Sequence, residues 1–323
     1  MSTDGLAARV RNALSRGWTF RRPPHAFVLT EDRLVHVSLP REARGVRPVG
    51  GASVSSRDLP PGTFREGPAG LPVAGPGLGQ ALSSLLSPKD RLTAASLAIP
   101  DRFVKAATVD LDPGAQKRPR ELAEMLRWKV SRLYGEPAPE LRITWCEAGA
   151  APDGGTRLLV LASPEETIAS LEAAFLGHGI RIGALEPAAL AVSAIASLAF
   201  AGTGLVVFTD GPNVSTVFLE KGAVRFLRTR ATAADPDQAL QEIRLAAAFV
   251  GGASADGSGL DTTGEVVVVP DAAPASIRFR EFLLENGGRE PLSLLPTLRT
   301  LGFPQWGEDT APLVGVGLLQ GVG

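Results

Sequence analysis

The sequence of 323 residues holds little that could crosslink the chain or ligate a metal ion. Its one cysteine, Cys146, excludes an intramolecular disulfide and a cysteine-based zinc cluster, and we expect it in a buried strand position beside Trp145. The three histidines lie far apart in the sequence and none has a metal-ligand spacing. We therefore predict no metal site, and we expect His25, His36 and His178 in loops or on the surface.

Excess charge and long apolar runs are also missing. There are 33 basic and 34 acidic residues, a net charge of −1, so no general basic field would attract nucleic acid or an anionic membrane. No apolar run reaches the roughly 18 residues that span a bilayer, and residues 188–200 read as a packed helix. Residues 6–15 predict an amphipathic helix packed on the body of the protein.

Sequence motifs of common catalytic sites are absent as well. The chain has no GxxxxGK[ST] phosphate loop, no HExxH and no GxSxG motif. Gly75, Gly77 and Gly79 match part of a dinucleotide fingerprint, but no strand precedes them and no acidic residue follows at the required distance. These absences favour a protein that is not an enzyme.

The pattern of apolar residues predicts strand pairs that alternate with helices. Residues 26–39 form two strands around a tight turn, and the Pro-, Gly- and Arg-dense residues 40–79 form loops with short edge strands. We expect further strands at 94–99, 104–111, 141–147, 157–162, 180–185, 265–269 and 292–294, helices at 119–134, from Pro187, at 236–250 and at 275–286, and a small-residue segment at 311–319. Ser163 is expected to cap a helix as the N-cap of a capping box with Glu166.

A three-stranded meander over residues 204–230 repeats the strand-turn-strand opening near residue 26. The chain therefore predicts a mixed-sheet α/β protein with duplicated halves. The turn of this meander, Asp210-Gly211-Pro212-Asn213, is either a plain β-turn with local hydrogen bonds or a phosphate-binding loop.

The middle of the sequence contains an ordered series of short motifs. They are Ile99-Pro100, Arg127-Trp128, Tyr134, Pro137, Ser163-Pro164-Glu165-Glu166 and Gly179-Ile180-Arg181-Ile182. In this order they resemble the type IV pilus assembly protein PilM and the cytoplasmic domain of the type II secretion protein GspL. The match covers residues 92–230, and the remaining parts of the chain resemble the family weakly.

The resemblance implies an actin-like fold, in which duplicated ribonuclease-H-like domains with mixed sheets and flanking helices carry an inserted small α+β subdomain. On that basis residues 1–101, joined by 185–202 and 311–323, form the first domain. Residues 102–184 form the insertion, and residues 203–310 form a reduced second domain.

The family's two phosphate loops and its adenosine motif are altered here. Val28 and Phe208 stand where the resemblance implies the loop aspartates, and Thr30 and Asp210 stand at the glycines. In the second loop, a shift of two residues would instead place Asp210 at the aspartate. In the adenosine motif, residues 270–273 replace a glycine run with Pro-Asp-Ala-Ala, which would crowd a base and remove an amide donor. These losses predict a cleft that does not hydrolyse ATP.

A vestigial nucleotide site would consist of Asp210, Gly211, Asn213, Ser215 and Glu186, the last by resemblance to the acidic residue that faces the metal-nucleotide. We expect no cofactor. The alternative is an ATP- and magnesium-binding actin-like protein, an ATPase or kinase relative, that uses the Asp210 loop.

The resemblance implies a non-catalytic cytoplasmic scaffold of a type IV pilus or type II secretion platform, held at the inner membrane through partner proteins. Its partner would be the short N-terminal peptide of a single-span, PilN-like inner-membrane protein, with an assembly ATPase as a second partner. The peptide would bind between the first domain and the insertion, near Val104, Val109, Arg127 and Trp128, unless Trp128 packs in the subdomain core. A regulatory actin-like protein unrelated to secretion is a further alternative.

Overall fold

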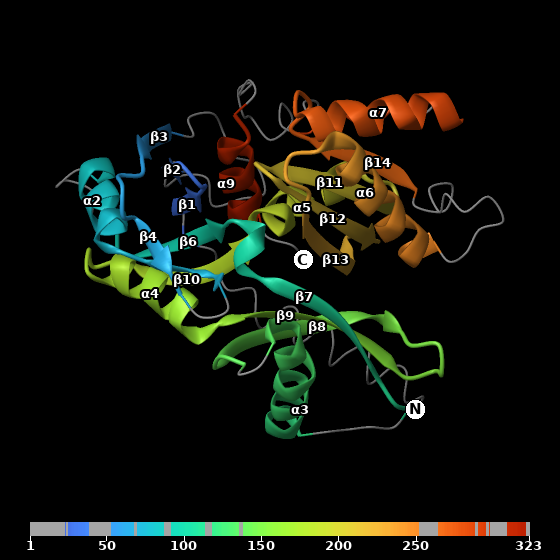
Figure 1. Ribbon diagram of the computed structural model, residues 1–323, viewed down its shortest axis with the longest axis horizontal. Coiled ribbons are helices and arrows are strands. Elements are labelled where there is room, and N and C mark those ends of the chain that lie inside the picture. Colours follow the sequence, from blue (N-terminus) through green and yellow to red (C-terminus); the bar gives the residue numbers. More distant parts are fainter. Residues whose placement is uncertain are drawn as a thin grey trace, which may run out of the picture.

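The computed structural model describes residues 23, 25–38, 53–67, 70–86, 92–113, 118–135, 138–251, 264–287, 290–294, 297 and 309–320. The predicted terminal helix at 6–15 lies outside these residues. Within them the strands form four sheets, two large ones at the centre and two small ones (Figure 1). No helix in this part of the chain has both the length and the apolar character needed to cross a bilayer.

The first large sheet has the strand order β10-β6-β1-β2-β3. Its strands are β1 (His25–Leu29), β2 (Arg33–Ser38), β3 (Ser53–Asp58), β6 (Ala94–Ile99) and β10 (Arg181–Pro187). The strands β1, β2 and β3 form an antiparallel meander, β6 pairs parallel to β1, and β10 pairs parallel to β6. The residues of β1 and β6 are almost continuously apolar because helices cover both faces of the sheet.

Alternate residues of the first sheet enter two different cores. Phe27 and Leu29 pack against α2 (Pro76–Leu85) and α4 (Glu165–Leu176) on one face. Ala26 and Val28 pack on the other face, where α5 (Ala188–Ala199) and α9 (Ala311–Gln320) lie. The period of two along a strand therefore divides one short segment between two cores.

The second large sheet repeats this arrangement with the order β13-β12-β11-β14. Its strands are β11 (Thr203–Asp210), β12 (Asn213–Glu220), β13 (Ala223–Ala231) and β14 (Glu265–Val269). Again three antiparallel strands form a meander, and a fourth pairs parallel to the first of them. The outer face carries α6 (Pro236–Gly251) and α7 (Pro274–Gly287). The repeat confirms the predicted mixed α/β architecture with duplicated halves.

The third sheet, β7-β9-β8, is built from the middle of the chain and lies beside the two large sheets (Figure 1). It consists of β7 (Lys105–Leu111), β8 (Leu141–Ala150) and β9 (Thr156–Pro164), and α3 (Pro119–Ser131) packs on one face through Leu126 and Val130. The resemblance assigned the following helix α4 and residues 181–184 of β10 to the insertion, but both pack with the first sheet. The fourth sheet pairs β4 (Phe64–Glu66) with β5 (Pro72–Ala74).

Some local predictions were wrong. Ser163 does not cap a helix, because β9 continues to Pro164 and the Ser163 hydroxyl donates to the carbonyl oxygen of Phe103. Residues 292–294 form no strand, although the amide of Leu292 donates to the carbonyl oxygen of Val266 at 2.7 Å. Residues 76–79, predicted as loop, begin α2, whose first helical position holds Pro76.

Two of the three histidines are also placed differently from the prediction. His25 and His36 lie on the paired strands β1 and β2, with Nδ1 of His25 3.2 Å from Nε2 of His36. His36 is buried and stacks on Phe27. The extended backbone brings together residues that are eleven positions apart, which sequence spacing could not reveal.

The two helices α5 and α9 cross closely between the large sheets (Figure 1). A Cβ atom at Gly317 would overlap the carbonyl oxygen of Ala191, so the crossing has no room for a side chain. Gly317→Ala should therefore lower the free energy of unfolding by about 1–3 kcal/mol, as overpacking of a core does. Urea unfolding measures the change. Gly202→Ala is the control because a Cβ there meets no atom within 4 Å; an equal loss in both variants would contradict the steric reason.

Candidate functional site

The two turns that open the duplicated halves lie against each other. At the second turn, Asp210 pairs with Asn213 across Gly211-Pro212, and the side-chain amide of Asn213 donates to the carbonyl oxygen of Asp210 at 3.3 Å. Gly211 has φ +55, where glycine is favoured, and a Cβ there would lie 3.7 Å from a carboxylate oxygen of Glu31 in the first turn. The second turn is thus a hairpin turn held by local hydrogen bonds.

Carboxylates dominate the charge at this junction. Glu31 forms an ion pair with Arg102, with 3.0 Å between Oε1 and Nε. Burial raises the pKa of Asp210 to about 6, with Glu31 and Asp32 adding to the increase and Arg102 opposing it. A polyanionic phosphate chain would meet these carboxylates, while the arginines beside them, Arg102 and Arg33, are already paired with Glu31 and Asp309.

Asp101 is the most deeply buried acid at this junction. Desolvation raises its pKa to about 7, while the amide of Ala189 and the nearby hydroxyl of Ser215 oppose the increase. The amide of Ala189, at the start of α5, donates to Oδ1 at 2.9 Å. Asp101 follows β6 of the first half and Ser215 lies on β12 of the second, so the carboxyl group joins the two halves.

The residues predicted for a vestigial nucleotide site are divided between two places. Asp210, Gly211, Asn213 and Ser215 lie at or next to the junction of the turns. Glu186 lines a different cavity, beside Leu190 of α5 and Cys146 of β8. In the described part of the chain, no three His, Cys, Asp or Glu side chains are grouped as a metal site would require.

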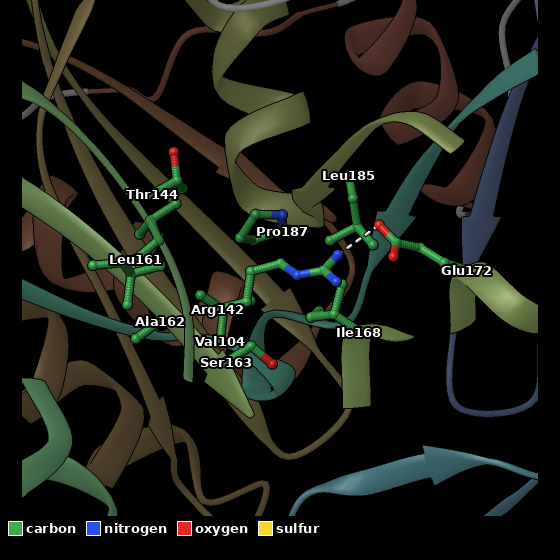
Figure 2. Close-up of a pocket in the computed structure, with 11 residues that line it drawn as sticks. Val104, Arg142, Thr144, Leu161, Ala162, Ser163, Ile168, Glu172, Leu185 and Pro187 are labelled. Atoms are coloured by element: carbon green, nitrogen blue, oxygen red, sulfur yellow. Dashed lines mark hydrogen bonds and ion pairs between the residues drawn. The ribbon is translucent and has the colours of Figure 1, made fainter. Parts of the chain in front are cut away.

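A groove lies next to the insertion, between its sheet and the strands β10 and β13 of the two large sheets. Two adjoining cavities of about 260 and 370 Å³ share Thr144, Leu161, Leu185 and Pro187. Figure 2 shows the first of them, in which Leu185 and Pro187 face side chains of β8 and β9. We call these two cavities together the insertion groove. Their combined size lies within the range of ordinary ligand sites.

The alternation of β8 and β9 explains why the insertion groove exists. Ile143, Trp145 and Val160 face α3, while Leu159 and Leu161 face the first domain. On β8 the groove side carries Thr144 and Cys146, both exposed, which leaves space between the sheet and β10. The prediction that Cys146 is buried was wrong because position 146 belongs to this open face.

Acidic groups also outnumber basic ones in the insertion groove. Arg142 forms ion pairs with Glu165 and with Glu172, the latter with 2.6 Å between the charged atoms (Figure 2). Both carboxylates raise the pKa of Arg142, so the arginine is already neutralised. Glu147 and Glu186 line the second cavity. The groove therefore favours an apolar segment that is neutral or basic.

The four residues predicted for partner binding do not meet in one place. Val104 lines the insertion groove, whereas Val109 and Trp128 line another cavity on the side of α3. Arg127 donates from Nε to the carbonyl oxygen of Leu141 at 3.2 Å. Trp128 is 59% exposed, so the alternative that it packs in the subdomain core is wrong.

The comparisons with known proteins concern the fold. No family model matches the sequence, and no curated protein does. Among solved structures, a chain of a PilM-PilN type IV pilus biogenesis complex is 17% identical, with a TM-score of 0.65, over 93% of this chain and 98% of that one. This chain has an actin-like fold, which it shares with that chain of the PilM-PilN complex.

Two further structures resemble this actin-like protein over a smaller share of the chain. The cytoplasmic domain of EpsL, an inner membrane component of the type II secretion system of Vibrio cholerae, is 12% identical, with a TM-score of 0.45, over 76% of this chain and 81% of that one. A protein of unknown function with an actin-like ATPase fold from Bacteroides thetaiotaomicron is 9% identical, with a TM-score of 0.47, over 80% of this chain and 88% of that one.

The sequence analysis missed the charged residues at the junction of the two turns and the open face of β8 in the insertion groove. Glu31, Arg102 and Asp101 escaped notice because each lies in an ordinary turn or after a proline. The signal for the groove was present in β8, where small and polar residues occupy one face of the strand (Thr144, Cys146, Ala148) and larger apolar ones the other.

Proposed function

We propose that this protein is a non-catalytic actin-like scaffold of a type IV pilus or type II secretion platform, and that the insertion groove binds the cytoplasmic tail of a PilN-like inner-membrane protein. The observation that carries the proposal is the groove itself, an apolar channel between the insertion and the first domain. The similarity in fold to a chain of a PilM-PilN complex supports it. In this proposal the protein is cytoplasmic and reaches the membrane only through its partner.

The groove suits an extended peptide. In the described residues β8 pairs only with β9 and β10 pairs only with β6, so a free edge of each strand borders the space between the sheets. A peptide could add to one edge and place alternate side chains against Leu161, Leu185 and Pro187. An assembly ATPase would be a second partner of the same platform.

The absence of catalysis is part of the same proposal. The turn of the second half makes its own hydrogen bonds, and Glu31, Asp32 and Asp210 surround it with negative charge. The alternative, an ATP-binding protein that uses the Asp210 loop, would need magnesium to offset these carboxylates.

Calorimetry with ATP and magnesium tests this part. We expect no binding heat, and no difference between the wild type and Asp210→Ala, because the phosphate chain would be repelled. Micromolar affinity for ATP that disappears in Asp210→Ala would contradict the proposal that the protein is non-catalytic. Tail binding by the same preparation shows that the protein is folded.

Cys146 provides a direct test of tail binding. It is the only cysteine of the chain, it is exposed, and it lines the insertion groove. The synthetic N-terminal peptide of the PilN-like protein from the same organism should slow its alkylation by maleimide, since a bound peptide would cover the thiol. A peptide of the same composition in scrambled order is the control. Unchanged alkylation at saturating peptide would contradict the proposal.

A further inference from the structure

A second groove opens on the other side of the insertion, away from the first domain. It has a volume of about 420 Å³ and lies between β7 and the side of α3. Four consecutive residues of β7, 107–110, line it together with side chains from residues 128–133. We call it the β7 groove. None of its lining residues belongs to the insertion groove.

The lining shows that the β7 groove runs along a strand edge. Successive side chains of a strand point to opposite faces of the sheet, so four consecutive residues can border one cavity only where it opens on the edge. Among the described residues β7 pairs only with β9, through its other edge. The backbone groups of β7 on the groove side are therefore available to an added strand.

Large apolar side chains flank this edge on the surface. Trp128 is 59% exposed and Leu133 is 42% exposed. The guanidinium carbon of Arg132 lies 4.4 Å from the centre of the Trp128 ring, which fixes the indole as an amphipathic platform. Exposed tryptophan beside arginine is typical of residues that anchor a protein partner.

The charge of the β7 groove is positive. Lys129 and Arg132 line it, and the one acidic residue in the lining, Asp110, is neutralised by two hydrogen bonds from Arg157 at 2.8 and 3.0 Å. Those bonds lower the pKa of Asp110, so its carboxylate stays ionised and its charge is balanced by that of Arg157. Along α3, Glu124 is paired with Arg120. The charge left for a ligand is that of Lys129 and Arg132.

We propose that the β7 groove binds an extended acidic segment of a protein partner, which adds as a strand to β7 and packs an apolar side chain against Trp128. The backbone edge supplies hydrogen bonds, Trp128 and Leu133 supply the apolar contact, and Lys129 and Arg132 select acidic side chains. This site is separate from the insertion groove and does not depend on the function proposed for it.

Other occupants fit the same observations less well. A phosphate backbone or an anionic membrane would use Lys129 and Arg132, but neither offers the alternating amide and carbonyl groups that a strand edge requires. A second copy of this chain, paired edge to edge, would place two basic grooves together. An acidic peptide accounts for all three features: it can hydrogen-bond to the edge of β7, pack on Trp128 and pair with Lys129 and Arg132.

A displayed library of random peptides, selected on the full chain, tests the proposal. We expect the enriched peptides to be acidic with an aromatic or branched apolar residue, and to increase hydrogen-exchange protection of residues 107–110. Synthetic copies should lose affinity by at least about tenfold in Trp128→Ala and in Lys129→Glu/Arg132→Glu. Arg118→Glu/Arg120→Glu is the control, because it makes the same charge change on residues that do not line the cavity.

Several results would overturn the assignment. These are enrichment without an acidic bias, equal affinity for wild type and the double reversal, or protection confined to other strands. Duplex DNA or phosphatidylglycerol vesicles that bind through Lys129 and Arg132 more strongly than the selected peptides would assign the groove to another class of ligand. That result would refute the proposed acidic peptide. Peptides that slow alkylation of Cys146 bind in the insertion groove and would count against the β7 groove.

Discussion

Replacing Asp101 with asparagine is expected to stabilise the protein at mildly alkaline pH and to remove most of the loss of stability that the wild type undergoes as pH rises toward neutrality. Asp101 is 2% exposed, and burial raises the pKa of its carboxyl group from 3.8 to about 7. Asparagine has the same shape and carries no charge. Its oxygen can still accept from the amide of Ala189, and its amide would lie beside the hydroxyl of Ser215.

The direction of this pH dependence follows from the number of protons bound by the folded and the unfolded state. The folded state holds the proton of Asp101 up to about pH 7, whereas the unfolded chain releases it near 3.8. The folded state therefore binds more protons in this window, and the free energy of unfolding falls as pH rises from about 4 to 7 and then becomes constant. A difference of about 3 pH units corresponds to at most about 4 kcal/mol. Asp210, with a pKa of about 6, contributes in the same direction.

Urea unfolding across this pH range measures the effect in the wild type, Asp101→Asn and a control. Asp58→Asn is a suitable control because Asp58 is exposed on the edge strand β3. The wild type and the control should lose stability with rising pH, and Asp101→Asn should lose much less. Parallel curves for all three would show that Asp101 is ionised in the folded protein and would refute the assignment.

The architecture could be predicted because its signals are local. Buried strands such as Val266–Val269 are nearly pure apolar runs, and the turn residues Asp210 to Asn213 carry the side chains that hairpins favour. The repeat of a strand-turn-strand opening in both halves was visible without any contact information. These features depend on residues that are neighbours in the sequence, so a single sequence contains them.

The chemistry of the junction could not be predicted in the same way. Glu31 and Arg102 are about seventy positions apart, and only the pairing of β1 with β6 brings them together. The burial of Asp101 depends on the second half, which supplies Ser215. The resemblance predicted that the phosphate loops lack their glycines, but the carboxylates around the turn became visible only once both halves were assembled.

The position of the partner site could not be predicted from the sequence either. The resemblance directed attention to Arg127 and Trp128 on a helix, and the structure places Trp128 on the far side of the sheet from the insertion groove. The faces of β8 decide which side chains meet the first domain. That choice depends on the register between β8 and β9, in which Thr144 pairs with Leu161.

Thr144→Arg is expected to weaken binding of the PilN-like tail by about thirtyfold or more, equivalent to at least roughly 2 kcal/mol. Thr144 lines both cavities of the insertion groove, so a long side chain there obstructs the channel where the two cavities join. Its own side chain is exposed on β8, and the substitution should leave the fold intact. If the tail is basic, the added positive charge would also repel it.

Thr144→Ala is the matched control at the same position, because it removes atoms without filling the groove. We expect it to bind the tail within about twofold of the wild type, since truncation of most interface residues costs little affinity. Fluorescence anisotropy of the labelled tail peptide gives the affinities, and equal unfolding midpoints show that both variants are folded. Retained affinity in Thr144→Arg would place the tail outside the insertion groove. If that affinity then disappeared in Trp128→Ala, the tail would lie in the β7 groove, and the two partner sites proposed for this fold would have to be exchanged.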